Sequence, residues 1–277
     1  MSLVFRLCVA LAGLSAGLAL LALGGCSAGN DAAADDDGPG HLSGEITVFA
    51  ASSLTDAFRE AGDRFEQSNP GTKVAFSFAS SATLATQLNE GAPADVFASA
   101  NQEQMSVVAT KGNVGEPRVF ATNSLVVVVP KGSSKVRSFS DLSRPGLKLV
   151  LAAPDVPAGQ YAREALKNAS SDSGYGADFS RRALANLKSE EPNVRVVLAK
   201  VQLGEADAGI VYGTDAAAAS ADVMRVDIPP ELNVVARYPV AVVKGSGRAA
   251  TASAFVEFLL GPEGQDLLRR FGFGPPS

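Results

Sequence analysis

Paired serines stand where two apolar segments of this chain give way to helices. Ser52 and Ser53 follow an apolar run that begins at Ile46, and Ser80 and Ser81 follow a second apolar run. A helix N-terminus presents backbone N–H groups with no partner inside the helix, and serine hydroxyls add further donors. Such a strand end can hold an anion. A serine at this position more often only caps its helix, and the recurrence of the pattern favours the anion site.

Two further segments offer donors of the same kind. Pro157 suits the first turn of a helix and leaves the N–H groups of Ala158 and Gly159 free. Tyr212 ends a short apolar strand. The stretch Ser53-Leu-Thr-Asp56 has the form of a capping box with Asp in place of Glu, so we expect Asp56 to cap its own helix.

Apolar strands alternate with helices from residue 45 onward, which predicts an α/β fold. In open α/β sheets, ligands bind beyond the carboxyl ends of the strands, where these donors lie. The long apolar run 119–129 exceeds a typical strand and is expected to cross between two lobes. The segment 177–188 is expected to be a helix.

The composition favours binding over catalysis. The chain has 277 residues, a net charge of −5, one histidine (His41) and two cysteines (Cys8 and Cys26). The negative charge argues against a nucleic-acid partner. No nucleophile elbow, phosphate-binding glycine loop or cluster with metal-ligand spacing is present. We therefore expect no enzyme activity, no cofactor and no direct cation ligands.

The N-terminus is typical of an exported lipoprotein. Arg6 precedes an apolar run over residues 7–23, and Leu-Gly-Gly leads into Cys26. Residues 1–25 are interpreted as a lipoprotein signal peptide, with Cys26 as the lipidated residue. An ordinary signal peptide or a membrane helix is the alternative. Residues 26–44 are small, acidic and Gly/Pro-containing, which predicts a flexible tether.

The candidate donors are neutral, and this restricts the anion. A fully ionised oxyanion needs only donors, whereas hydrogen phosphate also needs an acceptor for its proton. No Asp or Glu stands beside Ser81 or Ala158. The pattern therefore favours anions that are fully deprotonated at neutral pH, such as sulfate, molybdate or tungstate.

Seven segments, in this order, resemble the periplasmic molybdate-binding proteins (ModA) of ABC transporters. The resemblance extends from about residue 45 to residue 273. The segments are F-A-A-S-S-L-T-D-A-F (49–58), F-A-S-S-A-T-L (78–84), G-A-P-A-D-V-F (91–97), N-S-L-V-V-V (123–128), V-P-A-G-Q-Y-A (156–162), D-A-G-I-V-Y (207–212) and Y-P-V-A-V-V (238–243).

The resemblance implies a two-lobed type II periplasmic-binding protein, with the ligand in a cleft between α/β lobes. Lobe 1 would comprise residues 45–122 and 238–277, and lobe 2 residues 123–237. The ligand residues carried over by motif are Ser53, Ser81, Ala158, Val194 and Tyr212. The family commonly reads A-A-A-S-L before the first helix, so Ser52 remains an alternative to Ser53.

The implied function is capture of molybdate, and of tungstate, for delivery to a membrane permease of an ABC transporter. The protein would be a monomer, held outside the cytoplasm by the lipid on Cys26. Two alternatives remain: a protein of the same fold that binds sulfate or another small anion, and an adhesin or signalling lipoprotein without transport.

Overall fold

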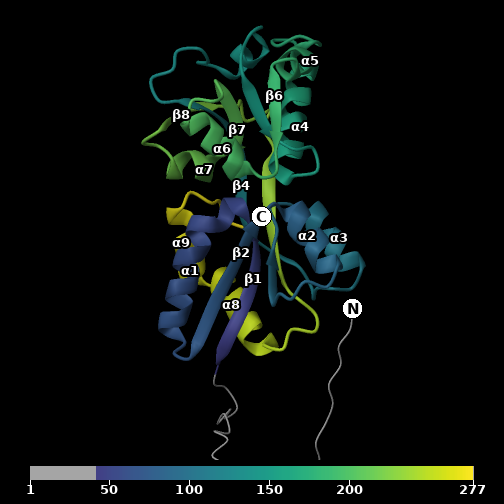
Figure 1. The fold of residues 1–277 in the computed structure, drawn as a ribbon, viewed down its shortest axis with the longest axis vertical. Coiled ribbons are helices and arrows are strands. Elements are labelled where there is room, and N and C mark those ends of the chain that lie inside the picture. The colour runs from purple at the N-terminus through teal and green to yellow at the C-terminus, as the bar shows by residue number, and fades with distance from the viewer. Residues whose placement is uncertain (1–41, 277) are drawn as a thin grey trace, which may run out of the picture. The chain divides into compact units, whose positions relative to one another are not determined.

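The computed structural model describes residues 42–276, and these residues form two α/β lobes joined by two long strands (Figure 1). The two-lobed α/β fold expected from the sequence is confirmed. The proposed signal peptide, Cys26 and the tether up to residue 41 lie outside the described residues. Within residues 42–276, no helix combines the length and apolar character needed to cross a membrane.

The lobe 1 sheet is built around strand β1, whose neighbours on both sides are parallel to it. The strand order is β2–β1–β3–β9–β4, and β9 runs antiparallel to β3 and to β4. The strands are β1 (Gly44–Ala51), β2 (Thr72–Ala79), β3 (Val96–Ala98), β4 (Arg118–Pro130) and β9 (Val235–Val242).

Alternate side chains of β1 enter two different apolar cores. Val48 and Ala50 pack in the larger core, whereas Phe49 packs in a second core with Phe97 and Leu84. This alternation follows from the pleat of a strand that is covered on both faces, as its apolar sequence predicts. The helices of this lobe are α1 (Thr55–Ser68), α2 (Ser81–Asn89), α3 (Gln102–Thr110), α8 (Ala249–Leu260) and α9 (Pro262–Arg270).

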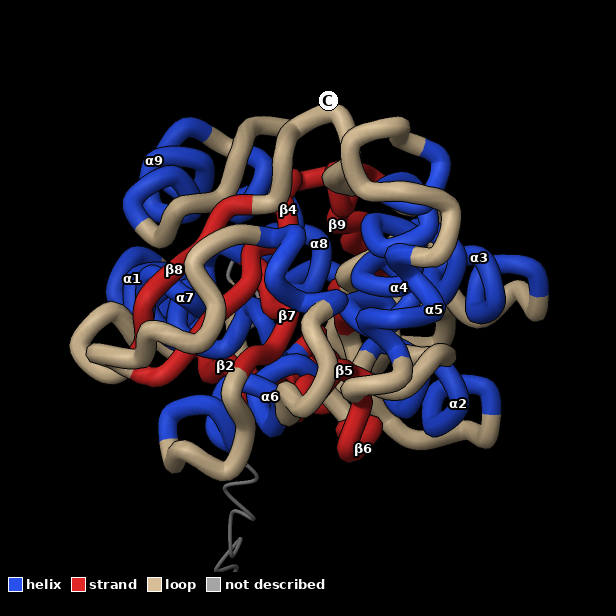
Figure 2. The backbone as a smooth tube through the Cα atoms, turned by 90° about the horizontal axis from the view of Figure 1, so that it is seen from above, coloured by secondary structure: helices blue, strands red, loops and turns tan. Residues whose placement is uncertain are grey.

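Strand β4 continues from lobe 1 into the sheet of lobe 2. It pairs with β9 as far as Ser124 and with β7 from Leu125 onward. Strand β5 then pairs with β7 and with β6, and β8 pairs with β4. The expected crossing over residues 119–129 is thus a strand shared by both sheets, and Figure 2 shows β4 beside both β7 and β9. The lobe 2 strands are β5 (Leu149–Ala152), β6 (Leu187–Glu191), β7 (Ala208–Tyr212) and β8 (Val223–Asp227).

The expected helix over residues 177–188 is wrong. The helix α5 covers Phe179–Leu184 only, and the strand β6 (Leu187–Glu191) begins three residues later. This strand lies at the edge of the sheet and pairs only with β5. Its sequence, L-K-S-E-E, is polar because alternate side chains face solvent, so no apolar run marks it. The other lobe 2 helices are α4 (Pro157–Ser171), α6 (Val194–Gln202) and α7 (Gly213–Ala218).

Candidate anion-binding site

A small cavity lies between the two lobes, where the carboxyl ends of β1, β2 and β7 meet the first turns of α2, α4 and α6. Its volume is about 10 Å³, close to the space of one water-sized sphere. Such a cavity suits a compact solute, and its walls must move outward to admit four oxygen atoms. The lining residues are Ala51, Ser52, Ser53, Ser80, Ser81, Ala100, Val156, Pro157, Ala158, Val194 and Tyr212. All five residues predicted as anion ligands are among them.

Ser80 and Ser81 have different roles at the start of α2. The Ser80 hydroxyl accepts a hydrogen bond from the Thr83 N–H (3.1 Å) and caps the helix. The Ser81 hydroxyl oxygen instead accepts the N–H of Ala100 at 2.9 Å. A backbone N–H can only donate, so the hydroxyl proton of Ser81 remains available for an acceptor in the cavity.

The capping box expected over Ser53–Asp56 does not form. A short 3₁₀ turn (Ser52–Leu54) intervenes after β1, and α1 begins at Thr55 without a side-chain cap. The Ser53 hydroxyl lies 3.0 Å from the phenol oxygen of Tyr238 instead. Ser52 also lines the cavity, and its side chain makes no hydrogen bond within residues 42–276, so both serines remain candidate ligands.

The N-terminus of α4 brings a backbone donor to the cavity. The first N–H bonded within this turn is that of Gln160, which donates to Val156 O at 2.9 Å. The N–H of Ala158 therefore has no partner inside the helix. Gly159 permits this close approach to β5, because a Cβ there would come within 2.1 Å of the carbonyl oxygen of Ala153.

The N-terminus of α6 supplies a second backbone donor. The Asn193 side chain accepts the N–H groups of Arg195 (3.0 Å) and Val196 (3.1 Å). The cap thus satisfies the second and third donors of the helix and leaves the first, the N–H of Val194, which lines the cavity.

Tyr212 places an unpartnered hydroxyl at the cavity. Its side chain is buried, and among residues 42–276 its hydroxyl has no hydrogen-bond partner. Burial raises the pKa of Tyr212 well above its ordinary value, and burial also raises the pKa of the neighbouring Tyr238. Both phenols therefore remain protonated at neutral pH, so Tyr212 can act as a donor.

The lining combines hydroxyl and amide donors with no ionisable carboxylate or basic group. Outside the lining, Arg195 forms one ion pair with Asp56 and another with Asp215. The arrangement can hold a compact, fully ionised oxyanion by hydrogen bonds alone. Sequence reasoning missed Tyr238 and Arg195, because both act through contacts with residues far away in the chain.

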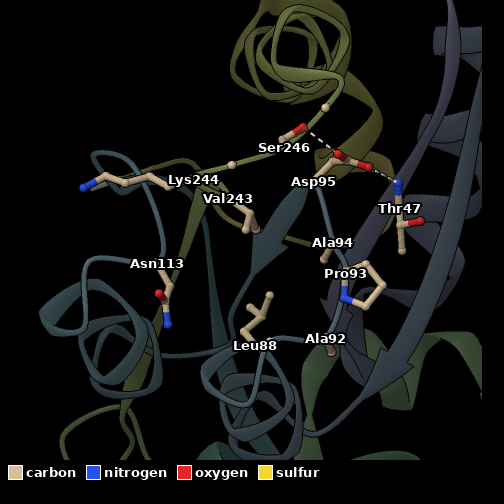
Figure 3. Close-up of a pocket in the computed structure, with 13 residues that line it drawn as sticks. Thr47, Leu88, Ala92, Pro93, Ala94, Asp95, Asn113, Val243, Lys244 and Ser246 are labelled. Atoms are coloured by element: carbon tan, nitrogen blue, oxygen red, sulfur yellow. Dashed lines mark hydrogen bonds between the residues drawn. The ribbon is translucent and has the colours of Figure 1, made fainter.

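A larger cavity of about 340 Å³ lies elsewhere in lobe 1 and contains none of the predicted ligands (Figure 3). Its carboxylate, Asp95, accepts hydrogen bonds from the N–H of Thr47 and the hydroxyl of Ser246, at 2.7 and 2.5 Å. The Lys244 side chain extends away from these groups. Its lining contains one carboxylate, Asp95, and one ammonium group, Lys244, and so differs from the neutral donor lining of the interlobe cavity.

Two lobes joined by crossing strands, with a donor-lined cavity between them, define a type II periplasmic-binding protein. The chain matches the family of bacterial extracellular solute-binding proteins over residues 46–274. The molybdate-binding protein ModA of Mycobacterium tuberculosis is 42% identical over 95% of this chain and 98% of its own length. The ModA protein of Escherichia coli is 40% identical over 83% of this chain and 89% of its own length.

Among solved structures, the sulfate-binding protein SubI of Mycobacterium tuberculosis superposes with a TM-score of 0.75. The superposition covers 83% of this chain and 86% of the SubI chain, and the sequence identity is 22%, so this similarity supports the fold alone. The chain belongs to the bacterial extracellular solute-binding protein family, in its ModA branch.

Proposed function

We propose that this protein is an extracytoplasmic solute-binding lipoprotein that captures molybdate, and also tungstate, for an ABC transporter. The observation that carries this proposal is the interlobe cavity of neutral donors, into which Tyr212 brings a buried hydroxyl without a partner. The names of the ModA relatives support molybdate as the anion.

In this proposal five groups bind the oxyanion. Lobe 1 contributes the hydroxyls of Ser53 and Ser81, and lobe 2 contributes the N–H groups of Ala158 and Val194 and the phenol of Tyr212. A tetrahedral dianion accepts hydrogen bonds at every oxygen, so donors from both lobes can surround it. The helix N-termini behind these donors add favourable dipoles.

Capture proceeds by closure of the two lobes. An open cleft admits the dianion to the donors of one lobe, and the second lobe then adds its own donors and excludes water. The dianion exchanges its hydration shell for fixed dipoles, and no counter-charge is needed in the lining. Movement of the lobes also accommodates an anion larger than the closed cavity of about 10 Å³.

The lining selects against protonated anions by its lack of an acceptor carboxylate. Hydrogen phosphate would find no carboxylate to accept its own proton, and a buried proton left without a partner costs about 1–3 kcal/mol. Sulfate presents the same acceptors as molybdate, so the choice between these two depends on the size of the closed cavity.

Cys26 carries the lipid that anchors the protein outside the cytoplasm, and the loaded, monomeric protein delivers its anion to a membrane permease. These follow from the lipobox-like sequence before Cys26 and from the ABC transporter family that the chain resembles. Labelling the protein with radioactive palmitate in cells, with Cys26→Ser as the unlabelled control, tests the anchor.

The function is tested by thermal unfolding of residues 42–277, which form one compact unit, with molybdate, tungstate, sulfate or phosphate. An anion at 100 times its Kd stabilises the protein by about 2.7 kcal/mol, or roughly 5–11 °C for a domain of this size. Shifts with molybdate and tungstate alone support the proposal. An equal shift with sulfate would contradict the choice of molybdate, and no shift with any of the four anions would overturn the oxyanion site.

A further inference from the structure

Arg195 joins the two lobes beside the anion site. It lies on α6, next to Val194, and its Nη2 donates to Asp56 Oδ2 on α1 at 2.7 Å. Its Nε lies 2.7 Å from Oδ1 of Asp215 on α7. Asp56 belongs to lobe 1, whereas Arg195 and Asp215 belong to lobe 2. Among the ion pairs of residues 42–276, Arg195–Asp56 is the one that connects the two lobes.

The two contacts of Arg195 respond differently to separation of the lobes. The contact with Asp215 is internal to lobe 2 and persists when the lobes move apart. The contact with Asp56 exists only while the lobes are together. Asp215 is fully buried, and Asp56 is 39% exposed in its side chain. Asp215 therefore holds the guanidinium in place on lobe 2, and Asp56 is the partner that arrives on closure.

The residues of these ion pairs lie close to three segments that contain proposed anion ligands. Asp56 lies three residues after Ser53, and Arg195 directly follows Val194. Asp215 accepts the backbone N–H of Tyr212 at 3.3 Å. The Arg195–Asp56 bond thus draws the Ser53 segment of lobe 1 towards the Val194 and Tyr212 segments of lobe 2.

We propose that Arg195 and Asp56 form an ionic latch that keeps the closed lobes together and sets the rate at which the bound anion is released. Neither side chain lines the cavity, so both are positioning residues. The latch rests on the proposed function, because it assigns a role to closure around an anion. Since the bond forms only after closure, its loss speeds opening and release and leaves the encounter with the anion unchanged.

The test compares Asp56→Ala with Asp63→Ala, which removes the same charge from an exposed position on the same helix. Stopped-flow tyrosine fluorescence reports anion binding, since the chain contains four tyrosines and no tryptophan. We expect Asp56→Ala to raise the molybdate dissociation rate about fivefold, the scale of a partly exposed ion pair, with an association rate within about twofold of wild type. Asp56→Glu, which keeps the carboxylate, should restore most of the slow release.

Thermal unfolding separates a latch from a purely structural contact. The shift in melting temperature with molybdate should be smaller in Asp56→Ala than in Asp63→Ala, because the anion stabilises the closed state in which the bond forms. An unchanged dissociation rate in Asp56→Ala would overturn the latch. An equal molybdate shift in the two variants would also overturn it.

A separate measurement tests the latch if the proposed function is wrong. If wild type binds none of the four oxyanions, that function fails, and small-angle X-ray scattering of the unliganded proteins then decides on the latch. A larger radius of gyration in Asp56→Ala than in Asp63→Ala supports it, because the lobes separate when the bond is lost. Equal radii would contradict it.

Discussion

The phenol oxygen of Tyr238 lies 3.0 Å from the hydroxyl of Ser53, although 185 positions separate the two residues. Tyr238 is fully buried on β9 and pairs with Ala121 of β4, at the crossing between the lobes. The strand that joins the lobes therefore also contacts a proposed ligand of the anion. With Tyr238 donating, the proton of Ser53 points to the cavity.

Replacement of Tyr238 by Phe should weaken molybdate binding about fivefold. The aromatic ring keeps its packing, and only the hydrogen bond to Ser53 is lost, which is worth about 1 kcal/mol. Isothermal titration calorimetry measures the change. Tyr175→Phe is the matched control, because Tyr175 packs on Phe139 and Phe179 in lobe 2 and does not line the cavity. Equal affinities of Tyr238→Phe and wild type would show that Ser53 needs no orienting partner.

Substitution of Ser80 and Ser81, at the start of α2, distinguishes a serine that caps the helix from a serine that binds the anion. Ser80→Ala removes the helix cap, and Ser81→Ala removes the acceptor of the Ala100 N–H, so each should destabilise the protein by about 1 kcal/mol. Only Ser81→Ala should reduce the affinity for molybdate, and the loss should be tenfold or more. A hydrogen bond to a charged group contributes about 1.5–3 kcal/mol. Urea unfolding and calorimetry on both variants give the comparison, and equal affinity losses would refute the assignment.

Tyr212→Phe should raise the stability of the unliganded protein and lower its affinity for molybdate. In the unliganded protein the buried hydroxyl of Tyr212 has no partner among the described residues, so its removal should stabilise the fold by about 1 kcal/mol. The same change removes a hydroxyl that is proposed to donate to the anion, and should lower the affinity at least about tenfold, on the scale of a charge-assisted hydrogen bond. A variant that is less stable yet binds as well as wild type would mean that Tyr212 is a core residue.

Asp215 should give the stability a distinctive pH dependence. Burial raises the pKa of Asp215 to about 6, and the nearby Arg195 offsets only part of this effect. The folded state therefore holds the Asp215 proton more tightly than the unfolded state. Its stabilising contribution is complete below the ordinary pKa of an aspartate and is lost as the pH rises through about 6.

Asp215→Asn isolates that contribution, because an amide does not titrate. Relative to the variant, wild type should lose about 2–3 kcal/mol of unfolding free energy between pH 4 and pH 7. Urea unfolding of both proteins across this range provides the measurement. Arg195 and Asp56 are the charged groups that face Asp215, and neither is altered. A difference that stays constant with pH would mean that Asp215 keeps an ordinary pKa.

The parts of the fold that depend on local sequence were predictable. The turns at Ser81, Ala158 and Val194 follow from short-range signals for strand ends and helix starts, and the structure brings all three to one cavity. Strand β7 ends at Tyr212 as expected. Convergence at the carboxyl ends of strands then follows from general rules for α/β sheets.

The incorrect predictions concern segments whose structure depends on contacts with residues far away in the sequence. The motif Ser53–Asp56 suggested a local cap, but Tyr238 and Arg195 provide the partners of its two ends. Strand β6 was missed because an edge strand with one neighbour needs no apolar run. Such contacts depend on tertiary packing, which overrides local preference.

The most direct test is a crystal structure of the molybdate-bound protein, measured at an X-ray energy where molybdenum scatters anomalously. We predict one strong anomalous peak in the interlobe cavity, within hydrogen-bond reach of Ser53, Ser81, Ala158, Val194 and Tyr212. The Arg195–Asp56 bond should be intact in that crystal. A molybdenum peak in the larger lobe 1 cavity beside Asp95, or no peak between the lobes, would contradict the account.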